Sequence, residues 1–144
     1  MPDGRVLGID AGERRVGVAL SDPTRLIASP VTVLDRRSGL APVLEALSEI
    51  ARTEDVRRLI VGLPLNEDGS RGRQARRAEG FARVAERVVG LPVELWDERL
   101  STREAEALAR AQGRNTRRLR QTGQMDALAA AVILQDYLDA HRTR

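Results

Sequence analysis

The fold is decided by two neighbouring stretches, Leu7-Gly8-Ile9-Asp10-Ala11-Gly12 and Val16-Gly17-Val18-Ala19-Leu20-Ser21-Asp22. The apolar run that leads into Asp10 predicts a buried strand whose last residue carries a carboxylate to the edge of a sheet. In the second stretch small residues alternate with larger apolar ones, which indicates a returning strand and a hairpin that turns at Gly12. A lone buried carboxylate costs several kcal/mol unless a cation or hydrogen bonds compensate it. Asp10 is therefore the first candidate for chemistry.

The rest of the chain alternates between strand and helix patterns. The apolar run at 57–63 lies between two amphipathic helices, which favours a strand buried on both faces and paired in parallel. The pattern at 74–89 predicts a helix that presents Val88, among others, to the core. We expect one α/β domain over residues 1–144, with a mixed five-stranded sheet (three antiparallel strands, then two parallel) and helices on both faces. The other expected elements are strands at 28–34 and 92–98 and helices at 40–52, 101–111 and 126–140.

Composition excludes several classes of protein. The 144 residues contain no cysteine, and the one histidine, His141, lies near the C-terminus, so thiolate chemistry and a histidine-based zinc centre are not expected. No apolar run approaches the roughly 20 residues of a membrane span, and the N-terminus lacks the apolar segment of a signal peptide. We therefore predict a cytoplasmic protein without membrane contact. All 24 basic residues are arginines, but the net charge is only +3, and for the missing lysine we favour genome base composition over phosphate binding as the explanation.

Three carboxylates are candidates for a single site. Asp10 ends the first strand, Glu98 ends the fifth, next to Asp97, and Asp126 opens the last helix. In open α/β sheets the ligand lies beyond the carboxyl ends of the strands, where the polar loop Asn66–Gly72 also falls. Carboxylates that lie within about 4–6 Å repel one another unless a cation or a proton intervenes. Oxygen ligands suit Mg²⁺ or Mn²⁺, and two such ions support phosphoryl transfer without histidine or cysteine.

Each acid also has a purely structural interpretation. Asp10 fits a turn residue that accepts backbone hydrogen bonds near Gly12. Asp97 and Glu98 fit a solvated pair on an edge strand, and because side chains alternate across a sheet, at most one of them points into the crevice. Asp126 fits a helix cap worth about 0.3–1 kcal/mol.

Arginines flank these acids and are candidates for binding a polyanion. With only one Trp, one Tyr and one Phe, a base-stacking platform is not expected, so nucleic acid would be held by its backbone or its shape. Ordinary solvated helix surface is the alternative. The candidate nucleic-acid-binding residues are Arg14, Arg15, Arg71, Arg73, Arg114, Arg117, Arg118 and Arg120.

The sequence resembles the YqgF/RuvX family of ribosomal RNA precursor nucleases in four blocks that follow in order along the whole chain. The blocks are Gly8–Gly12 with Arg15–Asp22, Gly62–Ser70, Asp97–Thr102 and Asp126–Leu138. The resemblance implies an RNase H-like fold related to the RuvC type of Holliday-junction resolvase. It implies catalytic and metal-binding acids at Asp10, Glu98 and Asp126, with Glu98 preferred over Asp97. It also implies a divalent metal and a cytoplasmic role in maturing small-subunit rRNA.

Two residues depart from the family pattern. Glu13 occupies a turn position where the family usually has a small hydroxyl residue, so the departure bears on a phosphate or metal contact at that turn. Gln124 stands where a basic residue often precedes the last acid.

We predict a divalent-metal-dependent endonuclease that cleaves structured RNA, namely the 5′ end of pre-16S rRNA, with branched DNA as the alternative substrate. Two other classes compete with this hypothesis. One is a nucleotide-binding ATPase of the actin/sugar-kinase type, which needs two such domains. The other is a non-catalytic RNA-binding or assembly module. The sequence leaves open whether the protein is a monomer or a homodimer.

Overall fold

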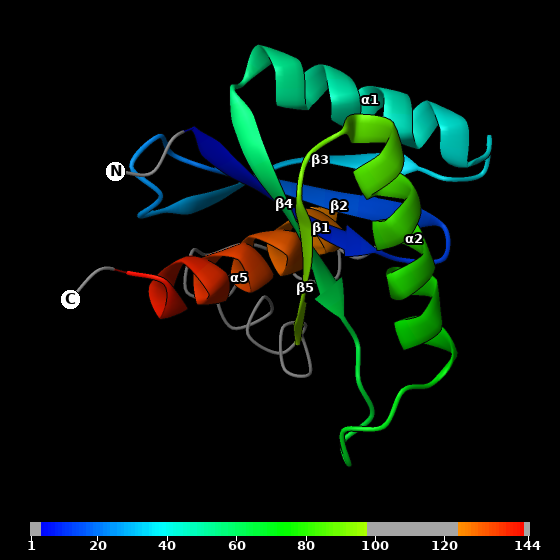
Figure 1. Ribbon diagram of the computed structural model, residues 1–144. Helices are drawn as coiled ribbons and strands as arrows, with labels where there is room; N and C mark the ends of the chain where they lie inside the picture. Colours follow the sequence, from blue (N-terminus) through cyan, green and yellow to red (C-terminus); the bar gives the residue numbers. More distant parts are fainter. Residues whose placement is uncertain (1–3, 98–123, 143–144) are drawn as a thin grey trace.

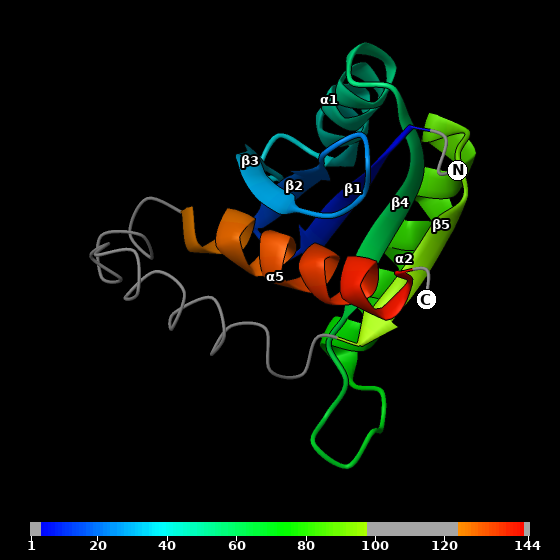
Figure 2. The same ribbon diagram turned by 90° about the vertical axis from the view of Figure 1, so that its left-hand side faces the viewer.

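The computed structural model describes residues 4–97 and 124–142 of the 144-residue chain. Its strands and helices form three layers, a central sheet with helices against each face (Figures 1 and 2). The elements are β1 (Arg5–Ala11), β2 (Arg15–Ser21), β3 (Ala28–Asp35), α1 (Leu40–Thr53), β4 (Val56–Leu63), α2 (Arg73–Val89), β5 (Val93–Asp97) and α5 (Gln124–Ala140).

The five strands lie in the order β3-β2-β1-β4-β5. The β1–β2 and β2–β3 pairs are antiparallel, while β4 runs parallel to both β1 and β5. The mixed sheet predicted from the sequence is confirmed. Because β1, β4 and β5 are parallel, their carboxyl ends meet at the same edge, where the β4–α2 connection projects beyond the sheet (Figure 1).

The alternation of side chains along the strands divides the core into two parts. Leu7 and Ile9 of β1 point toward α1 and α2, where they pack in one cluster with Leu47 of α1 and Phe81 of α2. The opposite face of the sheet packs against α5. Helices therefore cover both faces, as expected, and the apolar stripe of α1 is used for packing on the sheet.

The second face is built for close approach of a helix. A Cβ on Gly8 would lie 2.7 Å from the Cβ of Leu134, so β1 and α5 approach each other closely only because residue 8 lacks a side chain. Alanines on α5, among them Ala130, complete this tight contact.

One expectation about the core is wrong. Val88 was predicted to face the core, but its side chain is 52% exposed. It lies in the last turn of α2, before Gly90 ends the helix in a left-handed conformation. In the described part of the chain, no helix combines the length and the apolar character needed to cross a membrane.

Candidate active site

Asp10 and Asp126 lie together although they come from opposite ends of the chain. Asp10 pairs with Gly17 across the β1–β2 hairpin. Gly17 in turn lies directly under the start of α5, because a Cβ on it would overlap the carbonyl oxygen of Asp126 and come within 2.9 Å of the Ala127 nitrogen. The missing side chain at residue 17 thus lets the first turn of α5 reach the strand that pairs with Asp10.

The electrostatics of the two acids reflect this proximity. Burial, reinforced by the negative charge of Asp126, raises the pKa of the Asp10 carboxyl to about 7. Burial also raises the pKa of Asp126, and the positive charge of Arg15 opposes that shift. Two carboxylates in such a place are stable together only when a proton is bound or a cation neutralises them. If Asp10 were only a turn carboxylate that accepts backbone hydrogen bonds, its pKa would be lowered. The pKa is raised instead, which argues against that purely structural interpretation.

A cleft of about 730 Å³ opens beside Asp10 at the carboxyl edge of the sheet. One wall is the β1–β2 turn from Asp10 to Glu13, and the other is the β4–α2 connection with the first turns of α2. The polar loop Asn66–Gly72, which the sequence placed at this edge, thus contributes to the same cleft as Asp10. The residues of the second wall are Pro64, Leu65, Asn66, Gly72, Arg73, Gln74 and Arg77.

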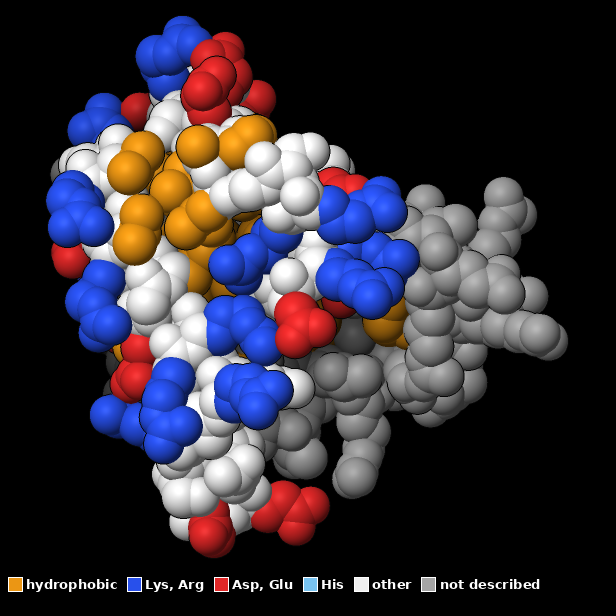
Figure 3. Space-filling view, turned by 90° about the vertical axis from the view of Figure 1, so that its right-hand side faces the viewer, with side chains coloured by type: hydrophobic (Ala, Val, Ile, Leu, Met, Phe, Trp, Pro, Cys, Tyr) orange, Lys and Arg blue, Asp and Glu red, His pale blue; other side chains and the backbone are white. Residues whose placement is uncertain are grey.

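The arginines predicted to bind nucleic acid fall into different surroundings. Arg73 lines the cleft and is exposed, whereas Arg71 forms an ion pair with Glu79 at 3.1 Å. Arg14 and Arg15 are exposed at the β1–β2 turn, and Arg15 is close enough to Asp126 to shift its pKa. Figure 3 shows that arginine side chains gather on this side of the molecule, with acidic side chains between them.

Sequence reasoning missed Arg36, and it considered Arg77 only as a member of the arginine cluster at the start of α2. Arg36 donates a hydrogen bond from Nη1 to the carbonyl oxygen of Gly12 at 2.9 Å, and its guanidinium lies 5.9 Å from the centre of the Phe81 ring. Arg77 forms an ion pair with Glu13 at 3.2 Å. The antiparallel β2–β3 pairing could have indicated the position of Arg36, because it places Asp35 opposite Arg15 and thus the β3–α1 loop beside the turn.

Several predicted site residues lie outside the described residues: Glu98, Arg114, Arg117, Arg118 and Arg120, as does the expected helix at 101–111. Within 4–97 and 124–142, no three acidic or histidine side chains group closely enough to hold a metal ion. The described part of the site therefore contains two of the three predicted acids.

Comparison with known proteins places the chain in a family. The sequence model of the RuvX family, described as Holliday junction resolvase, matches residues 4–140. The chain belongs to the RuvX family, which confirms the resemblance seen in the sequence.

Curated relatives agree with this assignment. A protein of Anaeromyxobacter sp. (strain K), named "Putative pre-16S rRNA nuclease", is 51% identical over 94% of this chain and 96% of its own length. Proteins with the same name from Syntrophus aciditrophicus and Chloroflexus aggregans are 43% and 41% identical. These matches cover 94% and 99% of this chain, and 89% and 98% of the relatives.

Solved structures identify the fold. The RuvC protein of Thermus thermophilus, in a complex with a Holliday junction substrate, superposes with a TM-score of 0.55 at 19% sequence identity. The match covers 95% of this chain and 94% of the RuvC chain. At that identity the likeness concerns the fold alone, which is RNase H-like, as the resemblance implied.

Proposed function

We propose that this protein is a divalent-metal-dependent nuclease that hydrolyses phosphodiester bonds at the 5′ end of the 16S rRNA precursor. The observation that carries the proposal is the meeting of Asp10 and Asp126 beside a cleft with arginines in its wall. The chain's family and the names of its curated relatives fit a nuclease. Processing of rRNA during ribosome biogenesis also implies a cytoplasmic protein.

The described residues fit a divalent metal ion. Asp10 and Asp126 offer oxygen ligands, which Mg²⁺ and Mn²⁺ prefer, and the raised pKa values mark a place where a cation would stabilise both ionised forms. When bound, one or two such ions would activate a water molecule and stabilise the departing oxyanion. Asp10 and Asp126 would hold them, with Glu98 proposed as the third acid.

The orientation of β5 argues against Asp97 as that third acid. Leu95 packs with the α1 and α2 side of the core, and Trp96 packs with the α5 side. Since side chains alternate along a strand, Asp97 lies on the side of Leu95, away from α5 and Asp126. This supports the preference for Glu98 that the family resemblance implies.

The arginines around the site would hold the nucleic acid through its phosphates. Arg73 and Arg77 line the cleft, and Arg14 and Arg15 lie at the turn on its other side. Guanidinium groups bind phosphate oxygens through paired hydrogen bonds and keep their charge at all relevant pH values. We include Arg71 and the arginines at 114, 117, 118 and 120 in this proposed surface.

Two substrates are consistent with the family. The names of the curated relatives favour pre-16S rRNA, whereas the family description favours a branched DNA junction. Both are polyanions with a bent or branched backbone, so the cleft chemistry does not separate them. We therefore propose pre-16S rRNA as the substrate and a Holliday junction as the second candidate.

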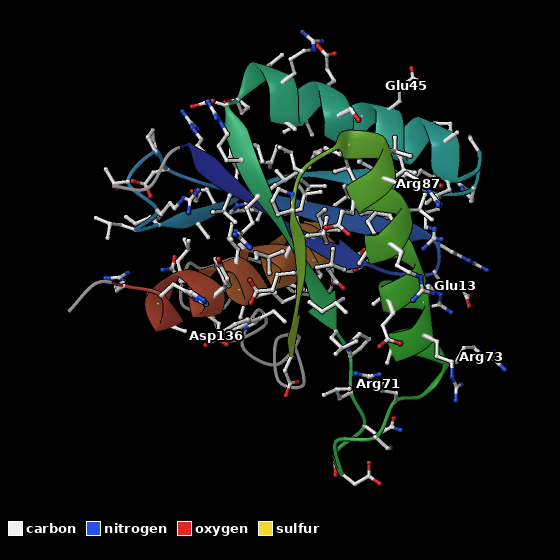
Figure 4. The ribbon with its side chains drawn as sticks, viewed as in Figure 1. Glu13, Glu45, Arg71, Arg73, Arg87 and Asp136 are labelled. Carbon is white, nitrogen blue, oxygen red and sulfur yellow. The ribbon has the colours of Figure 1, made fainter. Side chains whose placement is uncertain are left out.

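A side-by-side cleavage assay tests the proposal. Labelled pre-16S rRNA leader and a four-way DNA junction are each incubated with the protein and Mg²⁺ or Mn²⁺. We expect metal-dependent cleavage of the rRNA, and we expect Asp10→Asn to abolish it. The control is Glu45→Gln, which should leave cleavage unchanged, because Glu45 lies on the exposed surface of α1 and outside the cleft (Figure 4). RNA binding with steep salt dependence but no cleavage would instead indicate a non-catalytic assembly module.

A further inference from the structure

Glu13 and Arg77 face each other across the mouth of the cleft. Glu13, labelled in Figure 4, lies on the β1–β2 turn, and Arg77 lies on α2. Their side chains form an ion pair, with 3.2 Å between Arg77 Nη2 and Glu13 Oε2. The two partners are not equivalent. The Arg77 side chain is only 21% exposed, whereas that of Glu13 is 72% exposed. Arg77 is thus held by its surroundings, and Glu13 is the partner that solvent can readily separate from it.

Arg36 adds a second positive charge next to this pair. Its guanidinium is held by the Gly12 carbonyl and the Phe81 ring, which fixes its position. Arg36 binds the carbonyl of Gly12 and Arg77 pairs with the next residue, Glu13, so both guanidinium groups lie at the same turn. Burial and the positive charge of Arg77 both lower the pKa of Arg36. Two like charges near each other favour an anion beside them. In the protein alone, Glu13 provides that anion.

A carboxylate oxygen and a phosphate oxygen compete for the same guanidinium. Both accept charge-assisted hydrogen bonds, and phosphate offers more acceptor oxygens. We propose that Glu13 acts as an internal substitute for a phosphate: it holds Arg77 in the free protein, and a backbone phosphate of the nucleic acid entering the cleft displaces it. This inference rests on the proposed function, in that the cleft receives a phosphodiester backbone.

The consequence is a threshold for binding. Any polyanion must first replace Glu13, which costs a weakly bound and a tightly bound polyanion the same free energy and leaves the ratio of their affinities unchanged. A strand that also engages Arg73 and the rest of the wall recovers that cost through its other contacts. The turn glutamate thereby sets how much phosphate contact a substrate needs in order to bind.

Binding to RNA in the absence of divalent ions tests the inference without depending on cleavage. A labelled RNA stem from the pre-16S leader is titrated in chelator with the natural protein, Glu13→Gln and the control Glu45→Gln. We expect Glu13→Gln to bind about two- to fivefold more tightly at low salt, because Arg77 no longer has to be released. The slope of log K against log salt should stay the same, because Arg77 contacts the same phosphate in both proteins once RNA is bound. Glu45→Gln should change neither quantity.

A double-mutant cycle with Arg77 separates this mechanism from a general charge effect. In an Arg77→Gln background, Glu13→Gln should have no further effect on affinity, because the group that Glu13 competes for is gone. Arg77→Lys keeps a charge for which Glu13 competes, so Glu13→Gln should still tighten binding in that background, and this comparison remains if Arg77→Gln lowers stability. The inference would be overturned if Glu13→Gln increased RNA affinity equally with and without Arg77, or if Glu45→Gln increased RNA affinity as much as Glu13→Gln does.

The outcomes also separate this inference from the proposed function. If the protein cleaves pre-16S rRNA but Glu13→Gln behaves like Glu45→Gln, the inference fails and the nuclease function stands. If Glu13 and Arg77 are coupled in RNA binding but no metal supports cleavage, the nuclease function fails and the inference stands. If the natural protein does not bind RNA at all, both are wrong.

Discussion

The carbonyl of Asp126 lies directly against Gly17, so closely that no side chain fits at residue 17. Gly17 is also the residue that pairs with Asp10 in the β1–β2 hairpin. One small residue therefore connects two of the three proposed catalytic acids, Asp10 and Asp126. The site depends on this packing as much as on the acids themselves.

Gly17→Ala should consequently harm both stability and activity. The added methyl group would push α5 away from β2, and overpacking of this kind costs about 1–3 kcal/mol of unfolding free energy. Gly80→Ala is a suitable control, because nothing lies within 4 Å of a Cβ there and alanine favours the helix by roughly 0.5–1 kcal/mol. Urea denaturation of both variants checks this, and a Gly17→Ala protein as stable as the natural one would contradict the packing described.

The raised pKa of Asp10 predicts how stability changes with pH in the absence of metal. The carboxyl has an ordinary pKa of 3.8 and titrates at about 7 in the folded protein, so between these values the unfolded chain has lost a proton that the folded protein keeps. The contribution of Asp10 to the unfolding free energy should therefore fall as pH rises through this window, by up to about 1.4 kcal/mol per pH unit. Asp10→Asn should lack this fall.

The measurement is the difference in unfolding free energy between the natural protein and Asp10→Asn, from pH 4 to pH 8 in chelator. Adding Mn²⁺ at pH 8 should then raise the melting temperature of the natural protein only, since binding to the folded state stabilises it. A difference that does not change with pH would show that Asp10 is not buried beside a second acid.

Arg15 should influence the metal site and not only nucleic-acid binding. Its charge opposes the rise in the pKa of Asp126, so Arg15→Gln is expected to raise that pKa and shift metal binding to higher pH. Arg14→Gln removes the same charge from the neighbouring exposed position and serves as the control. Calorimetry gives the apparent Mn²⁺ affinity as a function of pH, and this profile should shift to higher pH for Arg15→Gln but not for Arg14→Gln. If the two variants had the same profile, Arg15 would have no specific effect on the metal site.

Arg73 lines the cleft, and we expect its loss to weaken RNA binding. Arg73→Gln should lower the affinity for a pre-16S leader stem about two- to fivefold and reduce the salt slope by about one phosphate contact. Arg87→Gln, at the far end of α2 (Figure 4), removes an equal charge away from the cleft. Titrations at several salt concentrations make the comparison; equal losses in both variants would indicate a general effect of net charge.

Much of the fold could be predicted because local patterns determine it. The apolar runs of β1 and β4 and the alternation in β2 led to the correct strands and pairing directions. The three-and-four spacing of α1 identified the residues that pack on the sheet. The expectation for Val88 was wrong because the three-and-four periodicity admits both Val88 and Val89 after the buried Ala85, and in the last turn of α2 it is Val89 that packs against the core. Periodicity shows which side of a helix is apolar, but not which of two neighbouring residues at the edge of that side is buried.

Contacts between distant segments could not be predicted from spacing. Trp96 packs edge to face on Tyr137 at 5.3 Å, and His141 stacks on Tyr137 at 4.1 Å, which gives the isolated histidine a packing role. Nothing in the sequence near Trp96 indicates these neighbours. The pairing of Glu13 with Arg77 is of the same kind, because it depends on how α2 lies against the β1–β2 turn.

Asp10 and Asp126 should bind the same divalent ion, and Mn²⁺ binding to four proteins tests this directly. The natural protein, Asp10→Asn, Asp126→Asn and the double variant are titrated and followed by electron paramagnetic resonance, with Glu45→Gln as the control for lost charge. If the two acids share an ion, each single variant should lose nearly as much affinity as the double variant, because the site needs both ligands. Independent, additive losses, or unchanged Mn²⁺ binding in the double variant, would contradict the account.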